Sequence, residues 1–197
     1  PFEDFSSNLH GTINIIKLCL NTSKKRLIFT SSMSVYGNYL NAASEKDDCN
    51  PKSFYGLSKL SCENYIKFFT KKKLNYTILR LFNIYGPGQN FENKLQGMVS
   101  IYLEDALKNN KIFVKGSKNR YRDFVYISDV IEILKKSRTN KDCINNTLNV
   151  GTGVKTKVSE LIRIISKNLN LKKDSIKFYK NTPDDTFGIF SNEKKIK

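Results

Sequence analysis

Short apolar runs alternate with longer segments of helical periodicity along this chain. Apolar residues recur at helical spacing over 5–20, 55–72, 98–107 and 158–169. Short apolar runs predict strands over 26–30, 76–82, 111–115, 123–127, 147–150 and 175–179. This alternation predicts an α/β protein with a parallel sheet, and such sheets bind ligands beyond the carboxyl ends of their strands.

The remaining segments predict loops and helix ends. Residues 32–54 and 83–94 are polar or carry Gly and Pro, so we expect loops there. Ser128 and Asp129 are typical N-cap residues, and the helix that they open should run to about Lys136. A last helix is expected to begin at Asn192.

A serine-rich stretch, Thr30-Ser-Ser-Met-Ser-Val-Tyr-Gly37, stands where a buried strand should end. Further on, Tyr55 and Lys59 lie four residues apart at the start of a predicted helix and therefore share one face. A free tyrosine has a pKa of about 10. A nearby cation and a helix N-terminus can bring that pKa toward neutrality, which makes a proton acceptor. Taken alone, Tyr-x-x-x-Lys also fits an ordinary half-buried helical tyrosine.

Several further segments accompany this pair in a fixed order. They are Ser7-Asn-Leu-His-Gly-Thr-Ile-Asn14, Leu79-Arg-Leu-Phe-Asn-Ile-Tyr-Gly-Pro87, Arg122-Asp-Phe-Val-Tyr-Ile-Ser-Asp-Val130 and Leu148-Asn-Val-Gly-Thr-Gly153. With the serine-rich stretch and the Tyr-x-x-x-Lys helix, this set resembles the extended branch of the short-chain dehydrogenase/reductase superfamily. These are the NAD-dependent nucleotide-sugar epimerases and dehydratases, and the set is similar to the UDP-glucose 4-epimerases among them.

The resemblance implies a role for each matching residue. Tyr55 would be the base, Lys59 would lower its pKa and hold the nicotinamide ribose, and Ser32 would hydrogen-bond the reacting sugar oxygen. The residues that would contact NAD are Ser7, Asn8, Ser31, Tyr55, Lys59 and Phe82. The residues that would contact a nucleotide-diphosphate sugar are Ser32, Ser34, Asn83, Val99, Phe113 and Arg122.

Arg122 and Asn83 would bind the diphosphate, and a guanidinium suits phosphate oxygens. The alternative for Arg122 is a surface ion pair with Asp123 or Asp129. Sugar selectivity would depend on pocket residues near 89–99 and 113–115.

Met33 and Ser34 stand where the related 4,6-dehydratases carry Asp and Glu. Without those carboxylates the elimination chemistry lacks its acid and base. The resemblance therefore favours a 4-epimerase, with UDP-hexose as the substrate class. The alternatives are a reductase or decarboxylase of the same family, and a non-catalytic nucleotide-binding protein.

No Gly-x-x-Gly-x-x-Gly turn occurs in the sequence, although the family binds its dinucleotide there. We therefore expect a Rossmann-like doubly wound parallel sheet that is incomplete at its N-terminus, with a small C-terminal substrate-binding lobe. Residues 1–90 would belong to the NAD-binding domain and 91–197 mainly to the lobe, with about 121–150 returning to the first domain. Alone, this chain is expected to bind NAD poorly and to be inactive.

The chain carries 34 Lys and Arg against 18 Asp and Glu, a net charge of +16. Much of this excess positive charge comes from lysines scattered along the chain, so we expect neither a nucleic-acid partner nor a membrane partner. One histidine and the absence of a Cys-x-x-Cys pair argue against a metal site, and the four cysteines suit a reduced, cytoplasmic protein. The family resemblance implies a homodimer that pairs through helices 5–20 and 55–72.

Overall fold

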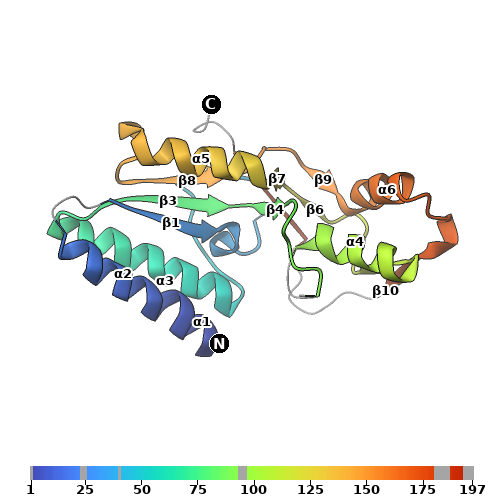
Figure 1. The fold of residues 1–197 in the computed structure, drawn as a ribbon, viewed down its shortest axis with the longest axis horizontal. Helices are drawn as coiled ribbons and strands as arrows, with labels where there is room; N and C mark the ends of the chain where they lie inside the picture. Colours follow the sequence, from blue (N-terminus) through green and yellow to red (C-terminus); the bar gives the residue numbers. More distant parts are fainter. Residues whose placement is uncertain (1, 23–25, 40, 93–96, 180–186, 193–197) are drawn as a thin grey trace.

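A three-stranded parallel sheet with helices on both faces forms one half of the molecule (Figure 1). The computed structural model describes residues 2–22, 26–39, 41–92, 97–179 and 187–192. The strand order is β1 (Arg26–Ser32), β3 (Asn75–Leu81), β8 (Asn146–Val150). Helices α2 (Gly11–Leu20) and α3 (Phe54–Phe68) cover one face, and α5 (Ile127–Thr139) covers the other. The predicted α/β class with a parallel sheet is confirmed.

The predicted N-terminal helix is one run of three geometries. It consists of α1 (Phe2–Asp4), the π-helix η1 (Phe5–His10) and α2. The second helix, α3, begins one residue before its predicted start and ends in a 3₁₀ turn, η3 (Phe69–Lys72). Ile16, Ile66 and Ile78 pack these helices against the sheet.

The second half of the chain builds a smaller lobe. Helices α4 (Met98–Asn109) and α6 (Val158–Asn168) pack on β5 (Ile112–Lys115), which pairs in parallel with β10 (Ile176–Tyr179). Its core is apolar and consists of Tyr102, Ala106, Ile112, Val114, Val158, Leu161, Ile162 and Ile165. The division of the chain into domains near residue 90 stays a prediction.

Short strands connect the two halves. The strands β2 (Ala42–Ala43), β11 (Gly188–Ser191), β6 (Tyr121–Arg122) and β9 (Thr156–Lys157) form one small sheet, and β4 (Asn83–Tyr85) pairs with β7 (Phe124–Tyr126). The two predicted loops thus contain β2, β4 and a 3₁₀ turn, η2 (Met33–Tyr36), while η4 (Lys141–Cys143) and η5 (Lys173–Ser175) complete the short helices. Segments of two to four residues are too short to show a periodicity.

The predicted N-cap of α5 is wrong. The helix begins at Ile127, Tyr126 occupies the cap position without a side-chain cap hydrogen bond, and Ser128 and Asp129 lie inside the first turn. Because β7 ends at Tyr126 and α5 follows it directly, the last residue of the strand takes the cap position instead of Ser128 or Asp129. The helix predicted to begin at Asn192 falls on 193–197, which lie outside the described residues.

Asp123 links the small sheet to the main sheet from a fully buried position. Its Oδ1 accepts hydrogen bonds from the backbone N–H and hydroxyl of Thr152 at 2.8 and 2.7 Å. Its Oδ2 accepts from Gly153 N at 3.0 Å and from the N–H and hydroxyl of Ser191 at 3.0 and 2.6 Å. One carboxylate therefore joins the link between β6 and β7, the loop after β8, and β11.

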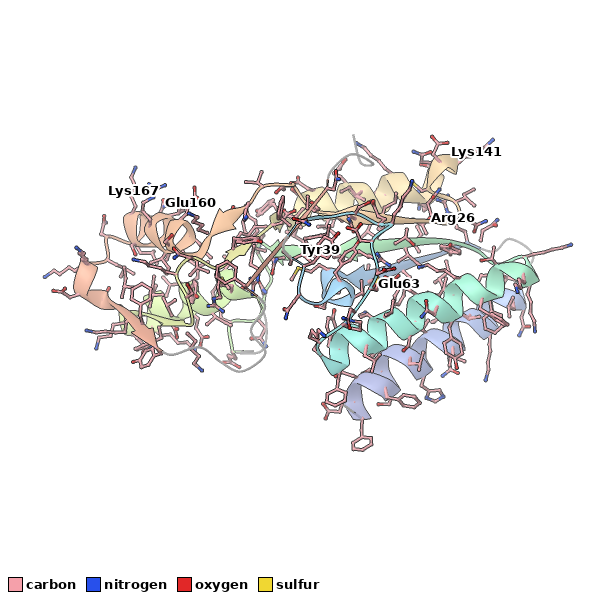
Figure 2. The ribbon with its side chains drawn as sticks, turned by 180° about the vertical axis from the view of Figure 1, so that it is seen from behind. Arg26, Tyr39, Glu63, Lys141, Glu160 and Lys167 are labelled. Carbon is pink, nitrogen blue, oxygen red and sulfur yellow. The ribbon has the colours of Figure 1, made fainter. Side chains whose placement is uncertain are left out.

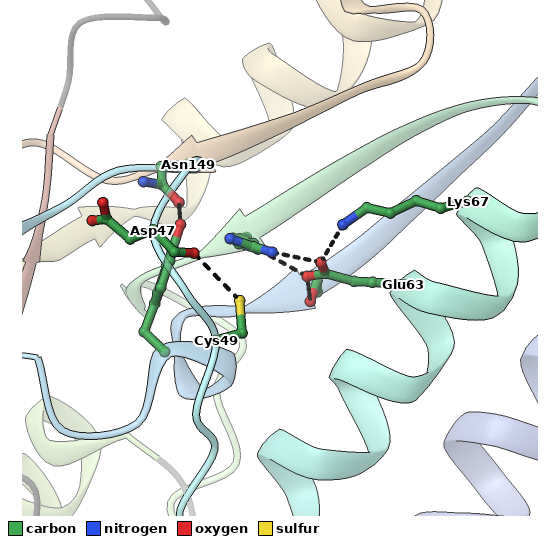
Figure 3. A network of polar contacts seen from close by, with 8 residues as sticks. Asp47, Cys49, Glu63, Lys67 and Asn149 are labelled. Atoms are coloured by element: carbon green, nitrogen blue, oxygen red, sulfur yellow. Dashed lines mark hydrogen bonds and ion pairs between the residues drawn. The ribbon is translucent and has the colours of Figure 1, made fainter.

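A buried ion pair fixes α3 against the sheet (Figure 3). Arg80 donates from Nε and Nη2 to the two carboxylate oxygens of Glu63, at 3.0 and 2.7 Å. Ser31 donates to Glu63 Oε1 at 2.6 Å, and Lys67 reaches Oε2 at 3.2 Å. Burial raises the pKa of the Glu63 carboxyl, but the hydrogen bonds and charge of Arg80 outweigh burial, and the net pKa is lowered.

Glu63 and Arg26 both lie in the half of the molecule that holds the three-stranded sheet, away from Glu160 and Lys167 of the lobe (Figure 2). Arg26 donates to the carbonyls of Arg138 and Asn140 at 3.1 and 3.0 Å, which ties the start of β1 to the end of α5. The start of β1 is thus occupied by structural contacts, and its carboxyl end is left for ligand chemistry.

Replacing Glu63 with Gln should lower the free energy of unfolding by about 3–5 kcal/mol, because Arg80 would keep a buried charge without its counterion. The depressed pKa of Glu63 gives the wild type stability that is present above the usual value of 4.5 and is lost as the pH falls through the folded-state pKa. Urea unfolding at several pH values measures both effects. Lys67→Gln is the control, since Lys67 is partly exposed and should cost under about 1 kcal/mol; equal losses in the two variants would contradict this account.

Candidate active site

Ser32 and Tyr55 meet where β1 ends and α3 begins. Ser32 is the last residue of β1; its hydroxyl accepts a hydrogen bond from Ser34 N at 3.2 Å and donates to Ser34 Oγ at 3.1 Å. Tyr55 lies in the first turn of α3 with its side chain partly exposed. The Ser32 side chain also interacts with Tyr55 and acts to lower the pKa of the Tyr55 phenol. The structure therefore brings together the two groups that the sequence pairs as acceptor and clamp.

The pKa of Tyr55 is nevertheless raised. Burial is the largest cause, the hydrogen bond with Ser32 opposes it, and the charge of Asp4 adds to it. Lys59 does not shift this pKa: its ammonium donates to the Thr30 carbonyl at 3.1 Å and lies 5.8 Å from the centre of the Tyr55 ring. The expected lowering by Lys59 is absent because the ammonium binds the nearest strand carbonyl instead of the phenol.

Gly56 allows α3 to approach the serine-rich turn. A Cβ at this position would lie 2.5 Å from the Ser34 carbonyl oxygen and 3.1 Å from Pro51 Cβ. Ser53 caps the helix by accepting from Gly56 N at 3.0 Å. The glycine inside the Tyr-x-x-x-Lys motif therefore sets the distance between Tyr55 and the turn.

A cleft of about 140 Å³ opens beside this pair. It is lined by Met33, Ser34, Gly37, Lys52, Ser53, Arg122 and Ile189. The cleft brings together two of the expected substrate residues, Ser34 and Arg122. Sequence reasoning missed Lys52, and its position between Pro51 and Ser53, the N-cap of α3, was the available signal.

Arg122 is buried and does not form the surface ion pair considered as its alternative role. Asp123 binds Thr152, Gly153 and Ser191, and Asp129 accepts from Ser128. The guanidinium donates to the carbonyls of Tyr121 and Phe187, at 2.8 and 3.4 Å. Burial and the neighbouring charge of Arg120 lower its pKa to about 10.

Other residues expected to bind ligands use their side chains within the fold. Ser31 is buried and donates to Glu63, and Phe82 packs with Val35, Tyr36 and Ile189. Asn83 donates to the Asp123 carbonyl at 3.2 Å. The ligand contacts expected of these residues stay predictions.

The remaining expected residues lie away from the cleft. Asn8 donates to Ser58 Oγ at 3.1 Å, and Ser7 donates to the Glu3 carbonyl. Val99 packs on the core of the lobe, and the Phe113 ring lies 6.1 Å from that of Tyr179. None of them lines the cleft as described.

Within the part of the chain that the structure describes, no three His, Cys, Asp or Glu residues gather as metal ligands. No helix there has both the length and the apolar content needed to cross a bilayer. All four cysteines are free thiols.

Comparison with known proteins identifies related sequences and structures. Residues 1–151 match the family described as the NAD dependent epimerase/dehydratase family. A protein of Methanocaldococcus jannaschii named as a candidate UDP-glucose 4-epimerase is 35% identical over 99% of this chain and 63% of its own length. The dTDP-4-dehydro-6-deoxyglucose reductase of Escherichia coli is 32% identical over 86% of this chain and 54% of its own.

Among solved structures, the UDP-glucose 4-epimerase of Thermotoga maritima with UDP-glucose superposes with a TM-score of 0.91. The two sequences are 27% identical, and the match covers 99% of this chain and 63% of that one. The predicted Rossmann-like fold is confirmed by this match. The chain spans somewhat less than two thirds of the length of the relatives that it matches.

Gly56→Ala should destabilise the fold by about 1–3 kcal/mol, because the added methyl meets backbone that cannot move without shifting the turn. Gly11→Ala is the matched control: this glycine lies in a helix, and its Cβ would meet nothing within 4 Å. There alanine should be neutral or stabilising by up to about 1 kcal/mol. Urea unfolding of both variants measures the change in the free energy of unfolding. A Gly56 variant as stable as the wild type would show that α3 and the serine-rich turn are not in tight contact at this position.

Proposed function

The chain belongs to the NAD dependent epimerase/dehydratase family, and from this we propose that it is part of an NAD-dependent nucleotide-diphosphate-sugar 4-epimerase acting on a UDP-hexose. The proposal rests on Ser32 at the carboxyl end of β1 and Tyr55 in the first turn of α3, whose side chains interact beside a cleft that Arg122 lines. Met33 and Ser34 supply no carboxylate for elimination at the same place.

The residues present fit the nicotinamide end of NAD. Tyr55 and Lys59 share a face at the carboxyl end of a parallel strand, where α/β sheets bind such ligands. The glycine-rich turn that binds the dinucleotide phosphates does not occur in these 197 residues. Weak NAD binding and inactivity of this chain alone therefore stay predictions. When bound, NAD would supply the hydride acceptor and donor for sugar C4.

The chain's own residues would manage the proton. Ser32 holds the 4-oxygen of the sugar, and Tyr55 removes the hydroxyl proton and later returns it. A phenol with a raised pKa stays protonated near neutral pH and cannot accept a proton. The ammonium of Lys59 must therefore leave the Thr30 carbonyl and turn toward Tyr55 when ligands bind. One helical turn separates the two residues, which makes this movement a side-chain rotation.

The second candidate is a nucleotide-sugar reductase of the same family, which the likeness to the Escherichia coli reductase favours. It would use the same Ser32–Tyr55 pair to deliver a proton to a keto sugar. Net consumption of reduced cofactor distinguishes it, because an epimerase regenerates its cofactor in every turnover. A non-catalytic nucleotide-binding protein would show neither reaction.

The activity test uses the protein as its gene encodes it, with NAD and UDP-glucose, and follows UDP-galactose by proton NMR. Tyr55→Phe should lower kcat by about 100-fold or more, because the phenylalanine has no proton to exchange. Tyr126→Phe, at another partly exposed tyrosine that does not line the cleft, is the matched control and should change kcat less than about twofold. Turnover that survives in the Tyr55 variant would remove this residue as the base.

We further propose that the protein is a cytoplasmic homodimer. The continuous helical run α1–η1–α2 lies beside α3 on one face of the sheet (Figure 1). Their large exposed apolar side chains are Phe2, Phe5, Ile15, Leu18, Phe54, Tyr55, Leu57, Tyr65 and Phe68. A monomer gains nothing from this apolar surface, whereas a second copy would bury it.

Leu18→Glu should convert the dimer into a monomer in sedimentation equilibrium, because it places a charge in the proposed interface. Phe178→Glu is the matched control, since Phe178 is similarly exposed but lies on β10 in the other lobe. A wild-type protein that sediments as a monomer, or a dimer that persists in the Leu18 variant, would contradict the interface.

A further inference from the structure

We propose that Lys155 is a positioning residue for nucleotide-diphosphate binding. Its ammonium lies on the face of the small sheet turned away from the cleft, and it stabilises the two strands that bring Arg122 and Ile189 to the cleft. This inference rests on the proposed function, since that function assigns the diphosphate to Arg122. It adds a residue that does not itself belong to the cleft lining as described.

The two faces of the small sheet have different surroundings. Ile189 of β11 and Arg122 of β6 are partners in the parallel register, and both line the cleft. Partners on neighbouring strands project to the same face, and the adjacent residues of each strand project to the other face. Tyr121, Gly188 and Phe190 therefore lie on the reverse face, which is turned away from the cleft.

The contacts of the Tyr121 ring agree with this placement. A Cβ on Gly188 would lie 2.3, 2.4 and 2.5 Å from the Cζ, Cε2 and Cε1 atoms of that ring, so the ring lies directly against the backbone of β11. The Phe190 ring meets it edge to face with the centroids 6.0 Å apart. Tyr121 thus packs β6 against β11, and a shift of its ring would move the strand that carries Arg122.

Lys155 covers these two rings. Its Nζ lies 3.9 Å from the centre of the Tyr121 ring and 5.4 Å from the centre of the Phe190 ring. Both distances fall within the range of about 6 Å over which a cation is attracted to an aromatic face. Tyr121 is buried, and the attraction grows as water is removed from the ring. The ammonium therefore stabilises the ring pair that joins the two strands.

The loop between β8 and β9 contacts both neighbours of Arg122. Gly153 N donates to Asp123 Oδ2 at 3.0 Å, and Lys155 covers Tyr121. Arg122 itself donates from Nη1 to the Tyr121 carbonyl at 2.8 Å, so the place of the guanidinium follows the backbone of Tyr121. Lys155 is exposed, whereas Asp123 is fully buried. Loss of the Lys155 charge should therefore displace the guanidinium without unfolding the protein.

Calorimetry with UDP on the protein as its gene encodes it measures this role. Lys155→Met keeps an unbranched stem without the charge, and it should raise the Kd for UDP and the KM for UDP-glucose about threefold, as expected for a cation–π contact of an exposed lysine. The value of kcat should change less than about 1.5-fold, because the reacting groups are untouched. Lys155→Arg should stay within about twofold of the wild type, since a guanidinium also binds ring faces.

Lys157→Met is the matched control. It removes the same charge from an exposed lysine on β9, and it should change the Kd for UDP less than about 1.5-fold. A threefold rise in this variant too would mean that the net charge of the small sheet, and not the contact of Lys155 with the rings, sets the affinity, and it would overturn the inference.

A direct contact between Lys155 and the phosphates would also weaken UDP binding, and a double-mutant cycle separates the two cases. In Tyr121→Leu, which lacks the ring, Lys155→Met should change the Kd less than about 1.5-fold, whereas in Tyr121→Phe the threefold effect should persist. If Tyr121→Leu does not fold, Phe190→Leu takes its place, and the effect should fall below about twofold. An undiminished loss without the ring would place Lys155 on the ligand and overturn the inference.

The remaining outcomes separate this inference from the proposed function. An unchanged Kd in Lys155→Met, in a protein that binds UDP, would overturn the inference alone, and so would a loss confined to the free energy of unfolding. A Kd for UDP that depends on Lys155, without formation of UDP-galactose, would support the inference and overturn the proposed reaction. A wild-type protein that binds neither UDP nor UDP-glucose would contradict both.

Discussion

The active-site geometry depends on how α3 is placed against β1. Three residues of α3, each four positions apart, meet three consecutive residues of the strand. Tyr55 bonds to the Ser32 side chain, Lys59 to the Thr30 carbonyl, and Glu63 to the Ser31 hydroxyl. Residues at this spacing form one stripe along a helix. The Glu63–Arg80 ion pair anchors the buried end of that stripe, and the reacting end opens at the cleft.

A buried ion pair is an expensive anchor, because both charges lose their hydration. Here the hydrogen-bond geometry of the Glu63–Arg80 pair offsets this loss of hydration. Arg80 is bidentate, Ser31 and Lys67 satisfy the same carboxylate, and the guanidinium lies 4.8 Å from the centre of the Tyr36 ring. Tyr36 in turn donates to Asn149 on β8 at 2.7 Å, so the anchor extends across the sheet. An apolar contact would hold α3 against β1 but would not fix where α3 stands along the direction of the strand.

The sequence predicted the meeting of the serine-rich turn and the Tyr-x-x-x-Lys helix, because the carboxyl ends of parallel strands share one edge. It did not predict what individual side chains do there. Lys59 was expected to face the phenol, but a strand carbonyl lies within its reach. Asp123 was considered a partner of Arg122, yet neighbouring residues of an extended segment point to opposite sides. Such choices depend on what packs above each residue, and a linear pattern does not contain that.

Two different buried carboxylates hold the elements around the cleft. Glu63 holds α3 against β1, the elements that carry Ser32 and Tyr55. Asp123 joins the segment beside Arg122, which lines the cleft, to Thr152 and Ser191. The proposed proton transfer would therefore depend on how α3 packs on β1, and the proposed ligand recognition would depend on where the small sheet places Arg122.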